Sequence, residues 1–414
     1  MTQPSRRDFL RGTLCTSAFL GCGGASGLFE RTARAASAQA DGRGTALVVI
    51  QLSGGNDGLN TVVPYEDDAY HRSRPTLHLA ADHVHKLEAG LGLHPDMPAF
   101  AGLYHEGRLS IVQGVGYPNS KRDHPVAMRD WQTALPLEAM TQTGWGGRVA
   151  DFAHTGVTTD VPSVFVGPIP PPFGVRAEQT VVPAIRSIDQ WLPLPGWPVA
   201  GESAPFPRAA LAVPASNPLL EFLRESTHRA CAARDRIQES RLARSADYPP
   251  YPLAQSLKSA AQLIRADLGI RFYLTELGGG EIGGFDSHAG QALNHGSLLR
   301  ELSESVAAFA ADLQHDRLFG SVLVMTFSEF GRSLSENGRR GTDHGAAAPV
   351  FLAGGGIKGG LVGKHPSLID LDQDAPRFHT DFRRLYATVL DRWLGIDSRR
   401  ILGESFAPLE GVIA

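Results

Sequence analysis

The stretch Leu47–Asn60, LVVIQLSGGNDGLN, joins an apolar run to a polar loop. The run is rich in β-branched residues and ends at a Gly-Gly turn, which is typical of the first strand of an α/β enzyme. Asp57 then follows, flanked by the amides Asn56 and Asn60. Open α/β sheets bind their ligands beyond the carboxyl ends of the strands. We therefore expect the Asp57 carboxylate to be presented to a ligand.

The rest of the chain alternates short β-branched runs with amphipathic stretches, which predicts a doubly wound α/β sheet. Further strands are expected at 109–115, 270–279, 321–331 and 348–360. Helices are expected at 98–105, 217–243, 254–268 and 297–313, and a last one runs from a cap at Thr380 or Asp381 to Gly395. The region 141–214 is expected to contain a short strand, loops and a peripheral hairpin.

Composition excludes some classes of function. The chain has 414 residues, a net charge of −4 and a pI of about 6.4, and it contains no basic block. A nucleic-acid partner therefore has no electrostatic support. Hydrophobic residues make up 42% and charged residues 20% of the chain, as in soluble globular proteins. We expect a chain that folds and has no nucleic-acid partner.

The N-terminus carries a targeting pattern. SRRDFLR at Ser5–Arg11 is followed by a weakly apolar, glycine-rich run and by the small residues ARAASAQA. This resembles a twin-arginine export signal, and the apolar run is too short and too weakly apolar to span a membrane. We therefore expect residues 1–40 to be a signal peptide read by the twin-arginine translocase. Residues 41–414 would then form a single exported domain, periplasmic or secreted, with no integral membrane segment.

The cysteines fit this interpretation. Cys15 and Cys22 lie in the signal, so only Cys231 remains in the mature chain and no intramolecular disulfide can form. Lipid modification of Cys22 is an alternative to simple cleavage of the signal. The twin-arginine route exports folded proteins, often with a cofactor already loaded, which favours a metal.

Carboxylates and histidines gather in loops after the predicted strands. The four places are GGNDGLN at Gly54–Asn60, YPNSKRDH at Tyr117–His124, GGFDSHAGQ at Gly283–Gln291, and the pair FSEFGR and GTDHGAAAPVFLAGGG between Phe327 and Gly356. Asp, Glu and neutral His are the donors that a divalent cation takes from proteins. Each of these residues could instead be an ordinary turn or cap residue, but four such clusters after strands favour a metal site. The candidate ligands are Asp57, Asp286, His288, Glu329, Asp343 and His344.

These segments carry a family resemblance. The pieces LSGGNDGLN, GYPN, DHPVAMRDWQTA, GGFDSHAGQ, TFSEFGR, GTDHGAAAPVFLAGGGIKGG and TDFRRLYATVLDRWLG extend from Leu47 to Gly395. They resemble the bacterial family named domain of unknown function 1501, whose members are exported by the twin-arginine route. This family is related to sulfatases within the alkaline phosphatase superfamily. The resemblance implies a three-layer α/β sandwich with a mostly parallel central sheet. Metal ligands and a nucleophile would lie at its C-terminal edge.

The resemblance also implies roles for individual residues. Asp286 and His288 lie where a metal-binding Asp and a nearby His are expected, and His344 lies where a late metal-binding His precedes the last strand. Three departures favour one metal over two. His288 follows Asp286 by two residues, whereas many superfamily members place the histidine four residues on. The first-strand aspartate of the superfamily aligns near Ser53, four residues before Asp57, and its usual Asp-His pair is replaced by Glu329 and Phe330. Asp343 would support the metal from behind or join it.

The nucleophile is less clearly marked. Ser120 lies four residues before His124, whereas relatives tend to carry a serine directly before that histidine. Either Ser120 serves as the nucleophile, assisted by His124 or Arg122, or the alcohol has been lost. The Cys-x-Pro-x-Arg signature of formylglycine sulfatases is absent.

Two functions remain at this stage. The first is an exported hydrolase of phosphate or sulfate esters that uses zinc, calcium, manganese or magnesium and acts on a small or polymeric anionic ester. The second is a secreted binding or assembly protein that keeps the fold without the chemistry.

Overall fold

The computed structural model describes residues 44–135, 141–153, 163–188, 236–241, 246–279 and 284–413. The expected signal peptide at 1–40, Cys231 and most of the helix expected at 217–243 lie outside these residues. None of the helices in the described ranges is long and apolar enough to cross a membrane.

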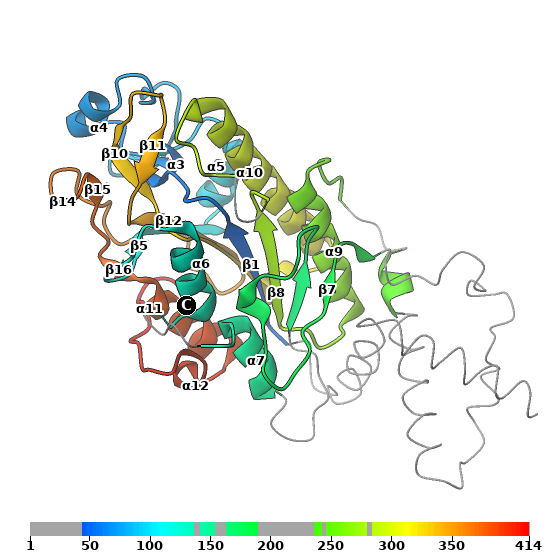
Figure 1. Cartoon of the computed structure of the whole chain (residues 1–414). Helices are drawn as coiled ribbons and strands as arrows, with labels where there is room; N and C mark the ends of the chain where they lie inside the picture. Colours follow the sequence, from blue (N-terminus) through cyan, green and yellow to red (C-terminus); the bar gives the residue numbers. More distant parts are fainter. Residues whose placement is uncertain are drawn as a thin grey trace, which may run out of the picture.

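A nine-stranded sheet forms the centre of the molecule (Figure 1). Its strand order is β13-β5-β12-β9-β1-β8-β6-β7, and β16 also pairs with β5. The strands are β1 (Ala46–Leu52), β5 (Leu109–Gly116), β6 (Ser163–Val166), β7 (Ala184–Ile185), β8 (Phe272–Leu277), β9 (Val322–Ser328), β12 (Ala348–Gly354), β13 (Gly360–Val362) and β16 (Thr380–Asp381). All pairings are parallel except those of β12, which runs antiparallel to both β5 and β9.

Helices cover both faces of the sheet, because the buried strands alternate their side chains between two cores. On one face, Val48 and Ile50 of β1 pack under α5 (Pro98–His105), α9 (Pro252–Ala266) and α10 (Gln291–His315). On the other face, Leu47 and Val49 pack under α6 (His124–Thr133), α7 (Trp145–Ala153), α11 (Phe382–Thr388), the π-helix η5 (Val389–Leu394) and α12 (Ser398–Leu402). The predicted three-layer α/β sandwich with a mostly parallel central sheet is confirmed.

A smaller cap covers the carboxyl edge of β1, with its own apolar cluster around Leu59, Tyr70 and Leu334. It contains the helices α3 (Gly58–Thr61) and α4 (Asp68–Ser73). It also contains the short strands β2 (Val62–Val63), β3 (His85–Lys86), β4 (Gly92–Leu93), β10 (Arg332–Glu336), β11 (Thr342–His344), β14 (Leu371–Asp372) and β15 (Ala375–Pro376). The 3-10 turns η1 (Phe173–Val175) and η4 (Phe319–Ser321) complete the elements.

Most expected elements occur where they were predicted. The last helix begins after Asp381, whose side chain accepts a hydrogen bond from the amide of Arg383, and ends at Gly395 in the left-handed conformation. The expectation for 141–214 was wrong in two respects within its described part. Residues 145–153 form helix α7, whose Trp145 is buried against Phe272 and Tyr386. The strands β6 and β7 pair in parallel and extend the central sheet, so they do not form a hairpin.

Candidate metal centre

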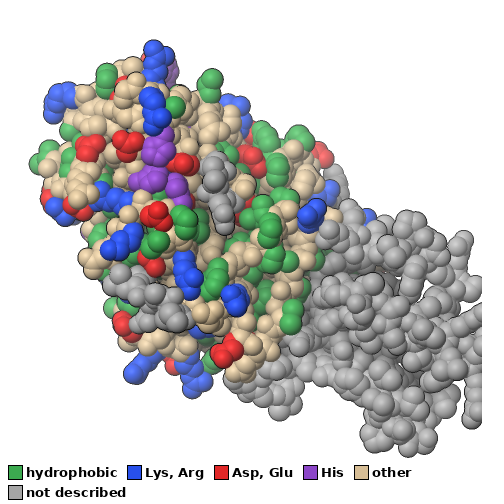
Figure 2. Space-filling view, in the orientation of Figure 1, with side chains coloured by type: hydrophobic (Ala, Val, Ile, Leu, Met, Phe, Trp, Pro, Cys, Tyr) green, Lys and Arg blue, Asp and Glu red, His purple; other side chains and the backbone are tan. Residues whose placement is uncertain are grey.

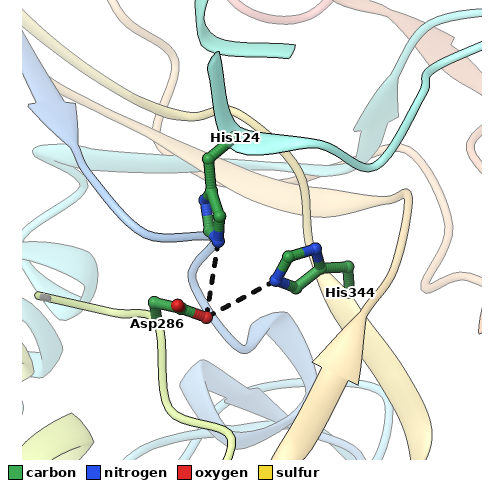
Figure 3. A group of neighbouring side chains, drawn as sticks. All are labelled: His124, Asp286 and His344. Carbon is green, nitrogen blue, oxygen red and sulfur yellow. Dashed lines mark ion pairs between the residues drawn. The ribbon is translucent and has the colours of Figure 1, made fainter. Parts of the chain in front are cut away.

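Asp286 lies at the centre of a cluster of histidines at the C-terminal edge of the sheet (Figure 3). It belongs to the loop between β8 and α10. His124 is the first residue of α6, after the N-cap Asp123, and His344 ends β11. The Oδ1 atom of Asp286 lies 3.4 Å from His124 Nε2, 3.2 Å from His288 Nε2 and 3.5 Å from His344 Nε2. Three ring nitrogens from three segments of the chain therefore converge on one carboxylate oxygen.

The outer nitrogen of each imidazole is held by a different acceptor. His124 Nδ1 lies 2.9 Å from Glu329 Oε1, and His288 Nδ1 lies 3.0 Å from Asp343 Oδ1. His344 Nδ1 lies 2.7 Å from the backbone oxygen of Arg122. Carboxylate and carbonyl oxygens accept hydrogen bonds, so each Nδ1 carries the proton. In the neutral rings, the Nε2 lone pairs are left facing Asp286 and one another.

The arrangement of these lone pairs fits a metal ion. His288 Nε2 and His344 Nε2 lie 3.0 Å apart, although neither has a proton to donate when its ring is neutral. His124 Nε2 is buried and has no hydrogen-bond partner. Ligands about 2.0–2.1 Å from a tetrahedral zinc ion lie about 3.3–3.4 Å from one another, close to the three distances from Asp286. The ligand atoms of His124, Asp286 and His344 all lie within 4.8 Å of one another, so a cation among these three donors would satisfy them, with His288 as a further donor beside Asp286 and His344.

The site is partly open to solvent. The side chains of His124, Asp286, His288 and His344 keep exposed fractions between 20% and 33%. Figure 2 shows histidine side chains side by side on the surface of this face, with acidic and basic side chains around them. A small molecule can therefore reach the cluster without a rearrangement of the core.

The charges around the cluster set its protonation. The hydrogen bond that His124 donates to Glu329 raises the pKa of His124, whereas burial lowers the pKa of His344. Burial alone would raise the pKa of Asp286, but the hydrogen bond and the charge of Arg332 outweigh it and lower the pKa. Asp286 is therefore an anion at neutral pH, as a ligand must be.

The guanidinium of Arg332 lies beside Asp286 and is surrounded by oxygen atoms that accept its hydrogen bonds. This buried group donates to Asp286 Oδ1 at 2.7 Å and to the backbone oxygens of Gly54, Gly55, Phe285 and Thr342. Glycine is needed in this turn, because Gly55 has a φ of 76° and a Cβ there would lie 2.4 Å from the Phe330 ring and 3.4 Å from Arg332 Nε. The cation of Arg332 is thus a fixed part of the site.

The structure turns Asp57 away from the cluster, contrary to its predicted role as a ligand. Its carboxylate is buried and pairs with both terminal nitrogens of Arg74, at 2.6 and 2.9 Å. Gln291 also donates to it, and Asp57 caps α3 through the amide of Leu59. The charge of Arg74 outweighs the effect of burial and lowers the pKa of Asp57. With every lone pair engaged in the interior, this carboxylate holds the cap together.

The other four predicted residues do not face the centre of the cluster. Glu329 is buried and accepts hydrogen bonds from the amide of Gly54 and from His124. It therefore orients a candidate metal ligand and is not itself one. Asp343 lies behind His288. The guanidinium of Arg122 reaches the side chain and backbone of Asp372. The Ser120 hydroxyl is buried beside Tyr117, and no contact in the described residues joins it to the cluster.

His124 is the residue whose geometry the sequence did not indicate. It was expected to assist a nucleophile, whereas its Nε2 atom points at Asp286 together with the nitrogens of His288 and His344. The sequence placed it in one of the loops that favour a metal site, and Asp-His-Pro fixes where the helix begins, but neither shows what the ring faces.

Comparison with known proteins supports the family resemblance over part of the chain. The family described as "Protein of unknown function (DUF1501)" matches residues 242–408. These residues include Asp286, His288 and His344 but not His124. No curated protein matches the chain.

Solved structures similar to this one come from several bacteria. A Zn complex of the C-terminal periplasmic domain of EcEptC from Escherichia coli is 10% identical, with a TM-score of 0.35, over 76% of this chain and 74% of that one. The PsFucS1 sulfatase from Pseudoalteromonas sp. is 13% identical, with a TM-score of 0.38, over 92% and 74%. A protein of the alkaline phosphatase superfamily from Vibrio parahaemolyticus is 8% identical, with a TM-score of 0.37, over 92% and 78%. At these values the similarities carry no conclusion about activity.

Proposed function

We propose that the protein is a metal-dependent hydrolase of phosphate or sulfate esters with one metal ion held by Asp286, His288, His344 and His124. The observation that carries the proposal is the convergence of three Nε2 atoms on Asp286 Oδ1, at 3.2–3.5 Å. Outer hydrogen-bond partners of this kind orient metal ligands in proteins. Here Glu329, Asp343 and the Arg122 carbonyl take that part.

The donor set favours zinc or a similar transition metal. Imidazole nitrogens suit zinc, whereas calcium and magnesium prefer six or more oxygen ligands. When bound, such an ion polarises an ester oxygen and lowers the pKa of a water molecule. His124 must lose its proton before it can bind, and Glu329 raises its pKa, so metal affinity should fall as the solution becomes more acidic.

Ser120 remains the candidate nucleophile. It lies on the same loop as His124, four residues before it. A serine that attacks the ester would leave a covalent intermediate, which water then clears. If Ser120→Ala retains full turnover, the attacking group is water instead.

A binding protein is the second candidate, and the closed donor set favours it. Four protein ligands complete a tetrahedron, as in structural zinc sites, whereas catalytic zinc sites keep one position open. Partial exposure of the cluster favours the hydrolase, because a substrate oxygen can approach from solvent as a fifth ligand.

The test is metal analysis of protein purified without chelators, followed by assays on phosphate and sulfate monoesters and diesters. The wild type should hold about one metal ion per chain and turn over at least one ester class. Asp286→Asn and His344→Gln should lose both properties. The control His315→Gln, at an exposed residue that pairs with Asp316 outside the cluster, should lose neither. Metal without turnover would favour the binding protein, and no metal in the wild type would contradict the site.

Family membership and export over the whole chain are part of the same proposal. The match over residues 242–408 supports membership in the family, and the paired arginines Arg6 and Arg7 support export of one domain covering 41–414. Replacing both with lysine should leave the protein in the cytoplasm, as measured by fractionation. Export of this variant at the normal rate would contradict the twin-arginine route.

A further inference from the structure

Arg122 belongs to a closed circuit of contacts around His344. Its backbone oxygen accepts from His344 Nδ1 at 2.7 Å, and its own φ of 52° is in the left-handed region. Such a conformation costs about 1–3 kcal/mol for a residue with a side chain, so surrounding contacts must maintain it. The guanidinium supplies one such contact by donating to the backbone oxygen and the carboxylate of Asp372 in β14, at 2.9 and 2.8 Å.

The β14–β15 hairpin is tied in turn to the strand that pairs with β11. Asp374, in the turn of this hairpin, accepts from the amide of Leu334 at 2.7 Å. Its carboxylate accepts from the amide of Ser335 at 3.1 Å and from the hydroxyl of the same residue at 3.0 Å. Leu334 and Ser335 belong to β10, which pairs with β11 and so returns to His344. The circuit thus runs from the ring through Arg122 and Asp372 to β10 and back to the ring.

We propose that Arg122 is a positioning residue: pinned by Asp372, it presents its carbonyl oxygen to His344 and thereby fixes the ring tautomer in which Nε2 is free to bind metal. The proposal rests on the metal centre proposed above. In this role the backbone carbonyl of Arg122 orients His344, so its guanidinium does not need to contact a substrate. It also explains why the guanidinium turns away from the cluster, toward the hairpin.

The tautomer can be measured without metal. In protein labelled with ¹⁵N-histidine, nitrogen shifts and two-bond couplings distinguish Nδ1–H from Nε2–H, and His344→Gln assigns the signal. Metal-free wild type at a pH where the ring is neutral should show His344 as Nδ1–H. Arg122→Ala and Asp372→Ala should each introduce the Nε2–H form. Because this readout needs no metal, it tests the circuit even if the proposed function fails.

Metal affinity gives the second readout. Loss of an outer hydrogen-bond partner typically costs about 10- to 100-fold in metal affinity. We expect Arg122→Ala and Asp372→Ala to weaken Zn²⁺ binding by about that factor, measured by competition with a chelator. Both substitutions remove the same contact between Arg122 and Asp372. The double variant should therefore bind Zn²⁺ no more weakly than either single variant.

Arg377→Ala is the matched control. Arg377 flanks the same hairpin and donates to Asp370 and to the Leu371 backbone, without reaching the Arg122 loop. This variant should keep both the Nδ1–H tautomer and the wild-type affinity. The proposal is overturned if His344 stays entirely Nδ1–H in both test variants, or if Arg377→Ala changes the tautomer as much as they do.

Discussion

His295 is a buried imidazole beneath the site that the fold keeps neutral. Its Nε2 lies 3.0 Å from Asn56 Oδ1, and burial lowers its pKa to about 3. Burial also lowers the pKa of His94, which packs edge-on against it, to about 4. Above the ordinary histidine pKa of about 6.5, both imidazoles are neutral in the folded and in the unfolded chain, so protonation costs the folded state no stability. As the pH falls below 6.5, only the unfolded chain takes up protons, so stability is lost.

The predicted loss is about 1.4 kcal/mol per pH unit for each such histidine, down to its folded pKa. Urea unfolding at about pH 7 and about pH 5 measures it. His295→Gln should unfold at lower urea than wild type at pH 7, but should lose less stability between the two pH values. His315→Gln, at an exposed position, should follow the wild type. If His295→Gln loses as much unfolding free energy between pH 7 and pH 5 as the wild type, the His295 ring does not cause the pH dependence.

Individual residues also show how far sequence reasoning reaches. The loop order placed Asp286, His288 and His344 near one another because such loops share one edge of the sheet, and the structure brings them together. The same reasoning failed for Asp57, because its partner Arg74 lies seventeen residues later in a segment without a recognisable pattern. The loop in which a carboxylate lies therefore predicts that it is near the site, whereas its hydrogen-bond and ion-pair partners decide whether it can bind a metal.

At the scale of elements, Arg148 of α7 joins the ends of two other helices. Its partly buried guanidinium donates to the backbone oxygens of Thr133, at the end of α6, and Ile401, in α12, as well as to Thr143. The carboxyl ends of helices carry partial negative charge, so they can serve as the counterion. Burial lowers the pKa of Arg148 to about 10, which leaves it charged at neutral pH. The contact holds α6, the helix that begins with His124.

Arg148→Met should destabilise the protein by about 2–3 kcal/mol, because it leaves buried carbonyl groups without a donor. Urea unfolding measures the change at constant metal content. Arg399→Met, at an exposed position on α12, is the control and should change stability by less than about 0.5 kcal/mol. Equal stability of the two variants would mean that water replaces the guanidinium at no cost.

Helices and strands were more predictable than their arrangement. The apolar periods located α9, α10 and the strands β1, β8, β9 and β12, because burial imposes those periods directly. They could not show that β12 runs antiparallel, since a strand buried on both faces reads alike in either direction. That reversal matters for the site: it puts the start of β12, just after His344, at the edge where the parallel strands end. Helix α7 was missed because Gly146 and Gly147 in its first turn disfavour a helix.

For the whole molecule, the four proposed ligands connect parts of the chain that are far apart in sequence. His124 begins a helix on one face of the sheet, Asp286 and His288 precede a helix on the other face, and His344 ends a strand of the cap. A ligand that binds only the folded chain stabilises it by RT ln(1 + [L]/Kd). A metal bound here should therefore oppose separation of both helical layers and the cap.

We expect Zn²⁺ at about 100 times its Kd to stabilise the metal-free protein by about 2.7 kcal/mol. Differential scanning calorimetry would show this as a higher melting temperature, reversed by a chelator. Asp286→Asn should abolish the increase, because it removes the charge on which the three imidazoles converge. Asp343→Asn should only reduce it, since Asp343 contacts the cluster through His288 alone. A melting temperature that does not respond to metal in wild type, or an equal response in Asp286→Asn, would contradict a metal that binds these three segments together.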